Sequence, residues 1–167
     1  MISTFYLSFI LLVNSILGIP FEKARESVLQ DLRAKKMGTP NPDFRQSKRT
    51  YNFLDVEVFG EYSPALYVFF DKGKFYRLYF EFAVPRSSKK NLKETLSDSI
   101  QSHFPNLEVK GPFYFVSKDG LHHIQITEES TGIIILNDWF GPMWKPQSRQ
   151  LFPQSLTDAW EKYKNSR

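Results

Sequence analysis

The 167-residue chain contains no cysteine, which excludes disulfide bonds, thiolate metal ligands and cysteine nucleophiles. Neither a nucleophile elbow nor a phosphate-binding glycine loop occurs, since the lone glycines of DKGK (71–74) and KDGL (118–121) suit turns. Catalysis therefore has no recognisable motif, and we expect no cofactor. The net charge of +4 is compatible with acidic partners without requiring them.

Histidine is also scarce, and only the adjacent pair His122 and His123 invites a metal or acid–base interpretation. Neighbouring residues on a strand point to opposite faces, so one metal ion cannot easily take both rings. No third ligand follows at a recognised spacing. The sequence therefore predicts no metal site.

The first twenty-one residues, MISTFYLSFILLVNSILGIPF, contain no Asp, Glu, Lys or Arg. An apolar stretch from Phe5 to Val13 followed by small and polar residues is typical of a secretory signal peptide. We expect residues 1–18 to be that signal, with cleavage near Gly18, although Ile16 is bulky for a cleavage-recognition position and no basic residue precedes the apolar run.

Two alternatives stay open for this segment. Residues 1–21 are about long enough to anchor the chain in a membrane uncleaved. They could also form an ordinary buried helix. Export without cysteine suits a bacterial envelope or secreted protein, so the expected location is periplasmic or extracellular.

Residues 19–167 are expected to form one domain, since their number suits a single hydrophobic core. Apolar residues at helical spacing predict helices over 21–36, 89–104 and 154–165, whereas the intervening segments alternate as strands do. The expected class is α+β, with an antiparallel sheet of six or seven strands packed on one face by the helices. The basic segment 38–50 reads as a solvated loop or linker.

Residues 66–82, LYVFFDKGKFYRLYFEF, carry eight aromatic side chains and predict a hairpin. A type I turn with a bulge at Asp71, Lys72 and Gly73 would place Phe69 opposite Phe75. One face then forms a core from Leu66, Val68, Phe70, Tyr76, Leu78, Phe80 and Phe82. The opposite face collects Tyr67, Phe69, Phe75, Arg77, Tyr79 and Glu81.

A second hairpin is predicted with a two-residue turn at Asp119 and Gly120. Its core side collects Phe113, Phe115, Ile124 and Ile126 with His122, and its other side collects Tyr114, Val116, Leu121, His123 and Gln125. A short match at an offset of 47 residues, with Tyr67 beside Tyr114 and Gly73 beside Gly120, weakly favours a two-fold repeat of a helix plus three strands.

The second aromatic face of the first hairpin is the candidate binding surface. Its residues are Tyr67, Phe69, Phe75, Arg77 and Tyr79, to which Trp139 and Trp144 of the following aromatic loop are added. The face is either a second core, covered by the loop Trp139–Phe152 or by a terminal helix, or an exposed contact surface enriched in aromatic residues and Arg as interfaces are.

The sequence thus favours an exported, non-catalytic binding or envelope-associated module. A structural or assembly protein of the envelope and an enzyme without a recognisable motif are the alternatives. A protein or envelope component is the expected partner. KGKFYRLYFEF departs from the register of RNA-binding strands, so no nucleic acid is expected. Membrane contact would come only through an uncleaved N-terminal segment.

Overall fold

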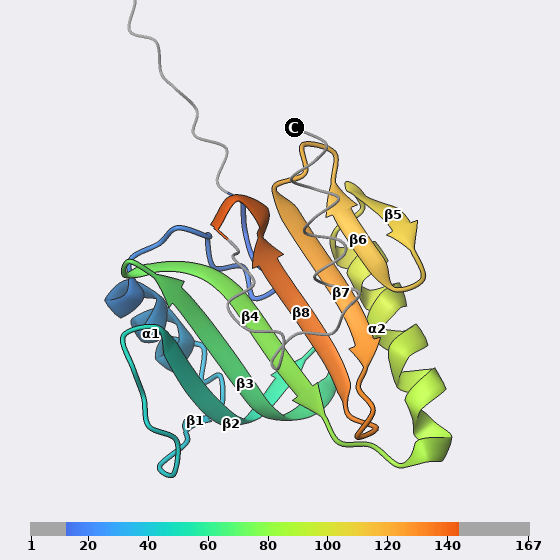
Figure 1. Ribbon diagram of the computed structural model, residues 1–167, viewed down its shortest axis with the longest axis horizontal. Coiled ribbons are helices and arrows are strands. Elements are labelled where there is room, and N and C mark those ends of the chain that lie inside the picture. The colour runs from blue at the N-terminus through green and yellow to red at the C-terminus, as the bar shows by residue number, and fades with distance from the viewer. Residues whose placement is uncertain (1–12, 144–167) are drawn as a thin grey trace, which may run out of the picture.

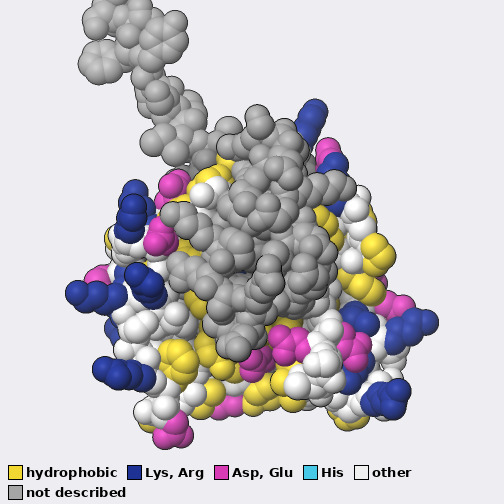
Figure 2. Space-filling view, in the orientation of Figure 1, with side chains coloured by type: hydrophobic (Ala, Val, Ile, Leu, Met, Phe, Trp, Pro, Cys, Tyr) yellow, Lys and Arg dark blue, Asp and Glu magenta, His cyan; other side chains and the backbone are white. Residues whose placement is uncertain are grey.

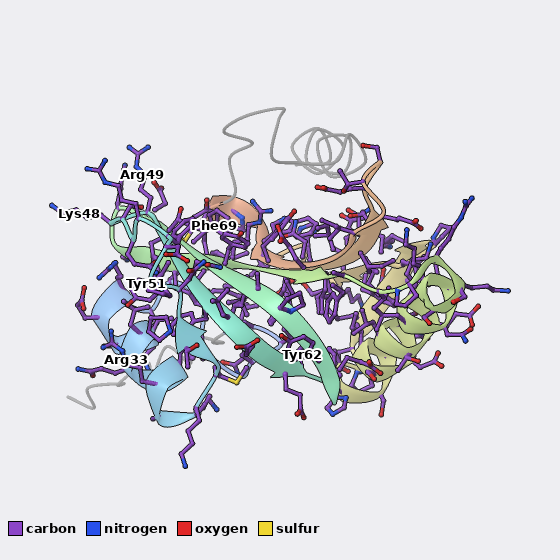
Figure 3. The ribbon with its side chains drawn as sticks, turned by 90° about the horizontal axis from the view of Figure 1, so that it is seen from below. Arg33, Lys48, Arg49, Tyr51, Tyr62 and Phe69 are labelled. Atoms are coloured by element: carbon purple, nitrogen blue, oxygen red, sulfur yellow. The ribbon has the colours of Figure 1, made fainter. Side chains whose placement is uncertain are left out.

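The computed structural model describes residues 13–143 of the chain. It has one eight-stranded antiparallel sheet, with two α-helices lying on the same side of it (Figures 1 and 3). The elements are α1 (Arg25–Ala34), β1 (Thr39–Pro40), β2 (Thr50–Val58), β3 (Glu61–Asp71), β4 (Lys74–Phe82), α2 (Lys89–His103), β5 (Leu107–Gly111), β6 (Tyr114–Ser117), β7 (His122–Glu128) and β8 (Ile134–Phe140), with single 3₁₀ turns at Arg86–Ser88 and Gly141–Met143.

The strand order is β1-β2-β3-β4-β8-β7-β6-β5, so a helix followed by four strands occurs twice and the two final strands pair at the centre. This architecture confirms the α+β class, but eight strands replace the six or seven expected. The additional strand is β1, only two residues long, within the segment interpreted as a loop.

The 47-residue offset does not describe this arrangement. It aligns the β3–β4 hairpin with β6–β7, whereas the hairpin at the equivalent place beside the sheet centre is β7–β8. The short sequence match therefore follows shared hairpin chemistry, and the repeat of a helix plus three strands is not matched.

Both described helices pack through apolar stripes, as their spacing predicts. Helix α1 buries Val28, Leu29 and Leu32. Helix α2 buries Leu92, Leu96 and Ile100, and it ends at His103, just before Phe104 and Pro105. Helix α1 begins later than expected because the chain before it is extended, where Ala24 bridges to Lys74. The helix predicted at 154–165 lies outside the described residues.

The first hairpin differs from the predicted register. Lys72 and Gly73 form a two-residue turn with φ of 49° and 78°, which pairs Phe70 with Phe75. A register shift next to Phe69 then places Phe69 opposite Arg77. Phe75 consequently lies on the helix-covered face, fully buried, and its predicted place on the second face is wrong.

The second hairpin has the predicted register, with Phe115 paired to Ile124 and Val116 paired to His123. Phe115, Ile124 and Ile126 are buried in the core, on the side of His122. The strand pairing is therefore as predicted, but the predicted two-residue turn is not. Residues 118–121 connect the strands, and Gly120 N donates to the Ser117 carbonyl at 2.8 Å.

Strand β2 departs from simple alternation at Asp55, whose φ is 57°. Phe53, Val56 and Val58 are buried, whereas Leu54 is partly exposed. Strict alternation would place Leu54 on the same face as Val56 and Val58, and the left-handed residue in mid-strand breaks that pattern.

The segment 13–21 packs against the helix-covered face. Ile19 and Phe21 are buried, and the Phe21 ring stacks on Phe75 and Phe140 with centroid distances of 5.1 and 5.8 Å. Neither helix of residues 13–143 is long and apolar enough to cross a bilayer.

Candidate functional site

The face of the sheet opposite the helices carries a cross-strand row of large side chains. Register pairs Phe69 with Arg77, Arg77 with Trp139, and Trp139 with His123. The adjacent row consists of Tyr67, Tyr79, Asn137, Gln125 and Tyr114. The structure therefore brings together four of the five hairpin residues predicted for this face and joins them to β7 and β8.

Arg77 lies at the centre of this face and is only 1% exposed. Its Nε donates a hydrogen bond to Asn137 Oδ1 at 2.7 Å, and its guanidinium carbon lies 4.6 Å from the Phe69 ring centroid and 5.2 Å from that of Tyr79. Burial lowers the pKa of Arg77 to about 9, so the guanidinium still carries its charge at neutral pH. Cation–π contacts and the amide together hold a desolvated cation.

His123 is held in its neutral form beside Arg77's neighbour Trp139. The two rings stack at 4.9 Å, the Tyr114 hydroxyl donates to Nδ1 at 2.9 Å, and Nε2 donates to the Gly120 carbonyl at 2.8 Å. Burial lowers the pKa of His123 to about 4. With both ring nitrogens engaged, His123 has a structural role in joining β6, β7 and β8.

The predicted contact residues differ in accessibility. Arg77, Tyr79 and Trp139 are buried, whereas Tyr67 and Phe69 are partly exposed. Phe75 is in the core beneath the sheet, and Trp144 lies outside the described residues. Of the predicted covering loop, residues 139–143 are described. Trp139 and Phe140 end strand β8 and Gly141–Met143 form a 3₁₀ turn, so the assignment of Trp139 to a loop above the face is wrong: it is part of the sheet.

On the helix-covered face, His122 Nε2 lies 2.6 Å from Asp138 Oδ1 and donates a hydrogen bond to this buried carboxylate. The two adjacent histidines point to opposite faces, as predicted. Ser117, five residues before His122, accepts hydrogen bonds from the backbone N–H groups of Leu121 and His122 and donates to Asp119. These bonds build the β6–β7 turn and leave Ser117 no arrangement typical of a nucleophile.

Metal binding has no support in the described part of the chain. Within residues 13–143, no group of three His, Asp or Glu side chains is placed to hold an ion.

A basic cleft lies at one end of the sheet, between the start of α1, the loop before β2 and the β3–β4 turn. Its volume is about 890 Å³, and its charged lining consists of Arg25, Glu26, Lys48, Arg49, Asp71 and Lys72. Figure 3 shows Lys48 and Arg49 together at this end of the molecule, extending outward. In Figure 2, basic side chains gather along the corresponding left margin of the surface.

The cations of this basic cleft differ in how they are engaged. Arg25 pairs with Glu26, and its guanidinium lies 5.7 Å from the ring centroids of both Tyr51 and Phe70. The Arg25 Nε is buried and makes no hydrogen bond. Lys48, Arg49 and Lys72 are exposed, and none of them forms an ion pair with another described residue.

The backbone fixes the position of these side chains. The Arg49 carbonyl accepts a hydrogen bond from Phe70 N at 2.8 Å, and the Gly73 carbonyl accepts one from Arg25 N at 2.9 Å. The α1 N-terminus and the loop before β2 are thereby both attached to the β3–β4 hairpin. The charge of the segment 38–50 was interpreted as that of a solvated loop. The cleft could not be foreseen from this segment, because it forms only when three distant segments are brought together.

No family model matches the sequence, and no curated protein or solved structure matches it either.

Proposed function

We propose that the chain is an exported, non-catalytic binding module that takes an anionic ligand in the basic cleft. The observation that carries this proposal is the convergence of Lys48, Arg49 and Lys72, all without an ion-pair partner among the described residues, on one cleft with Arg25. The export part rests on the apolar N-terminal sequence.

The size and shape of the cleft suit a ligand with more than one anionic group. Its volume of about 890 Å³ falls within the range of small-molecule sites. Like charges close together repel, and a bound anion would relieve that repulsion while accepting hydrogen bonds from Arg and Lys. Glu26 and Asp71 line the same cleft, so the anionic groups are expected nearer the three unpaired cations.

The partly exposed aromatic residues Tyr67 and Phe69 lie near this cleft without lining it. Thr50 follows Arg49 and pairs with Phe69, while the Tyr67 ring contacts Phe44 edge-on at 5.7 Å. Figure 3 places Phe69 inward of Arg49 on the same side of the sheet, with Tyr51 and Arg33 on the other side. Aromatic side chains beside Arg are a composition that binding surfaces favour.

Calorimetric titration with pyrophosphate and, separately, with citrate tests the proposal and distinguishes phosphate from carboxylate recognition. A Lys48→Ala/Arg49→Ala double variant should bind at least about tenfold more weakly, because hydrogen bonds to charged groups contribute roughly 1.5–3 kcal/mol each. Binding should also weaken as salt is added.

The matched control is Lys90→Ala/Lys118→Ala, which removes the same net charge from α2 and the β6–β7 turn. Both of these side chains are exposed and lie outside the basic cleft. Equal weakening in the two double variants would reduce the effect to net charge and contradict a localised site. Failure of both anions to bind at millimolar concentration would reject the proposal.

A further inference from the structure

Asp138 is a fully buried carboxylate on the helix-covered face of β8. It is the one buried Asp or Glu among residues 13–143. Its Oδ1 lies 2.6 Å from His122 Nε2, and its Oδ2 accepts a hydrogen bond from the backbone N–H of Ile16 at 2.7 Å. The N-terminal segment therefore reaches this carboxylate through a main-chain nitrogen, 122 residues away in sequence.

A buried carboxylate needs more than neutral donors, because desolvating an unpaired charge is costly. The other ionisable groups near His122, namely His103, Lys118 and Asp119, line an open cleft of about 570 Å³ and are exposed. A fixed positive charge on the Ile16 nitrogen would compensate Asp138 from inside the fold.

The sequence around Ile16 permits such a charge to form. Signal peptides are cut after a small residue, with a second small or compact residue two positions earlier. A cut after Ser15 places Ser15 and Val13 in those positions, whereas a cut after Gly18 places the larger Ile16 there.

The two cuts have different consequences for the fold. Cleavage after Gly18 would remove Ile16 altogether, take one donor from Asp138, and create an ammonium group at Ile19, which is 1% exposed. Cleavage after Ser15 keeps Ile16 and gives up the backbone hydrogen bonds of residues 13–15, such as Gly18 N to the Ser15 carbonyl at 2.8 Å.

We propose that the mature chain begins at Ile16 and that its α-ammonium group pairs with Asp138. A signal peptidase would hydrolyse the Ser15–Ile16 peptide bond: water adds to the Ser15 carbonyl, the C–N bond breaks, residues 1–15 leave with a carboxylate, and the Ile16 nitrogen takes up protons to become ammonium. This inference rests on the export part of the proposed function and revises the expected cleavage point from Gly18 to Ser15.

N-terminal sequencing and intact mass of the chain, expressed with its own N-terminus in an exporting host, test the cleavage. The expected first residue is Ile16. A first residue of Ile19 would overturn this inference while leaving export intact, and an intact Met1 would reject export as well. Anion binding at the basic cleft, measured on the same material, is independent of either result.

Acetylation of the α-amino group by an N-hydroxysuccinimide ester at neutral pH tests the pairing. Each unit by which pairing raises the amine's pKa slows acetylation about tenfold, so folded protein should react at least tenfold more slowly at Ile16 than urea-denatured protein. Asp138→Asn should abolish this protection, and Asp119→Asn, at the exposed turn, should retain it.

If Asp138→Asn fails to fold, the acetylation rates of folded and denatured wild-type protein test the pairing by themselves. Equal acetylation rates for Ile16 in folded and denatured wild-type protein would show that the amino group is free and overturn the pairing.

Discussion

Truncating Phe75 to alanine tests the hairpin register that placed this ring in the core. Phe75 is fully buried, stacks on Phe21 at 5.1 Å and contacts Phe70 at 6.3 Å. If the predicted register had been adopted, the same ring would lie on the second face among Tyr67 and Phe69. The substitution therefore separates two packings of one sequence.

The magnitude follows from the buried area. An aromatic side chain buries roughly 150–250 Å², which at about 25 cal/mol per Å² corresponds to about 4–6 kcal/mol as an upper bound. Measured truncations of buried Phe cost about 3–5 kcal/mol. We expect the free energy of unfolding of Phe75→Ala to fall by about 4 kcal/mol, with anion binding at the basic cleft unchanged wherever the variant remains folded.

Urea unfolding followed by circular dichroism measures this loss. Val109→Ala on β5 is the matched control, since Val109 is 58% exposed and surface truncations usually change stability by about 0.5 kcal/mol or less. A loss below about 1 kcal/mol for Phe75→Ala would refute its position in the core.

Two further predictions concern acid sensitivity and backbone conformation. The pKa of His123 is about 4 in the folded state and its ordinary value is 6.5, so the unfolded chain binds a proton first as the pH falls. The free energy of unfolding should therefore fall by roughly 3 kcal/mol between pH 6.5 and pH 4. Urea unfolding curves measured across this pH range should show a smaller fall for His123→Gln. An unchanged slope in this variant would assign the acid sensitivity to other groups. Gly38→Ala should destabilise by about 2 kcal/mol or more in urea, because φ is +69° and the new Cβ would lie 2.2 Å from the Leu54 carbonyl oxygen. Gly60→Ala, with φ of +77° and no atom within 4 Å of its Cβ, should cost only the backbone strain, and an equal loss in both variants would dismiss the steric argument.

Sequence periodicity predicted an element and its buried residues correctly wherever a local pattern alone determined them. The four-residue spacing of Leu92, Leu96 and Ile100 specified α2 and its buried stripe. In the β6–β7 hairpin, centring the turn on Asp119 and Gly120 predicted the register correctly, although the connection spans residues 118–121. These elements required no information from distant parts of the chain.

The β3–β4 turn shows where local reasoning was insufficient. A two-residue turn needs a left-handed backbone at Lys72, which lysine rarely adopts, so the sequence favoured a longer turn. The structure has the left-handed Lys72 and shifts the register near Phe69 instead. Because the turn is one residue shorter than predicted, Phe75 lies on the opposite face of the sheet.

The basic cleft and the contact of Ile16 with Asp138, on which the two proposals rest, were harder to foresee because both depend on tertiary proximity. Arg25, Lys48 and Lys72 are charged residues in three separate segments, and charge alone is the usual mark of a solvated surface. The contact between Ile16 and Asp138 joins the two ends of the described chain, and no local pattern indicates it. Alternation did place Arg77 and Tyr79 on one face, but it could not give their burial.

The central position of the β4–β8 pair has a consequence for the order of folding. Strands β2 to β4 and β5 to β7 pair with sequence neighbours through short turns, whereas Arg77 and Asn137, in contact across the centre, are 60 residues apart. Such a contact must close a large loop before any of its interactions are gained. We therefore expect each half of the sheet to form its local pairs first and the pairing of β8 with β4 to limit the folding rate. Substitutions in the β4–β8 pair should then slow refolding more than equally destabilising substitutions in the outer hairpins.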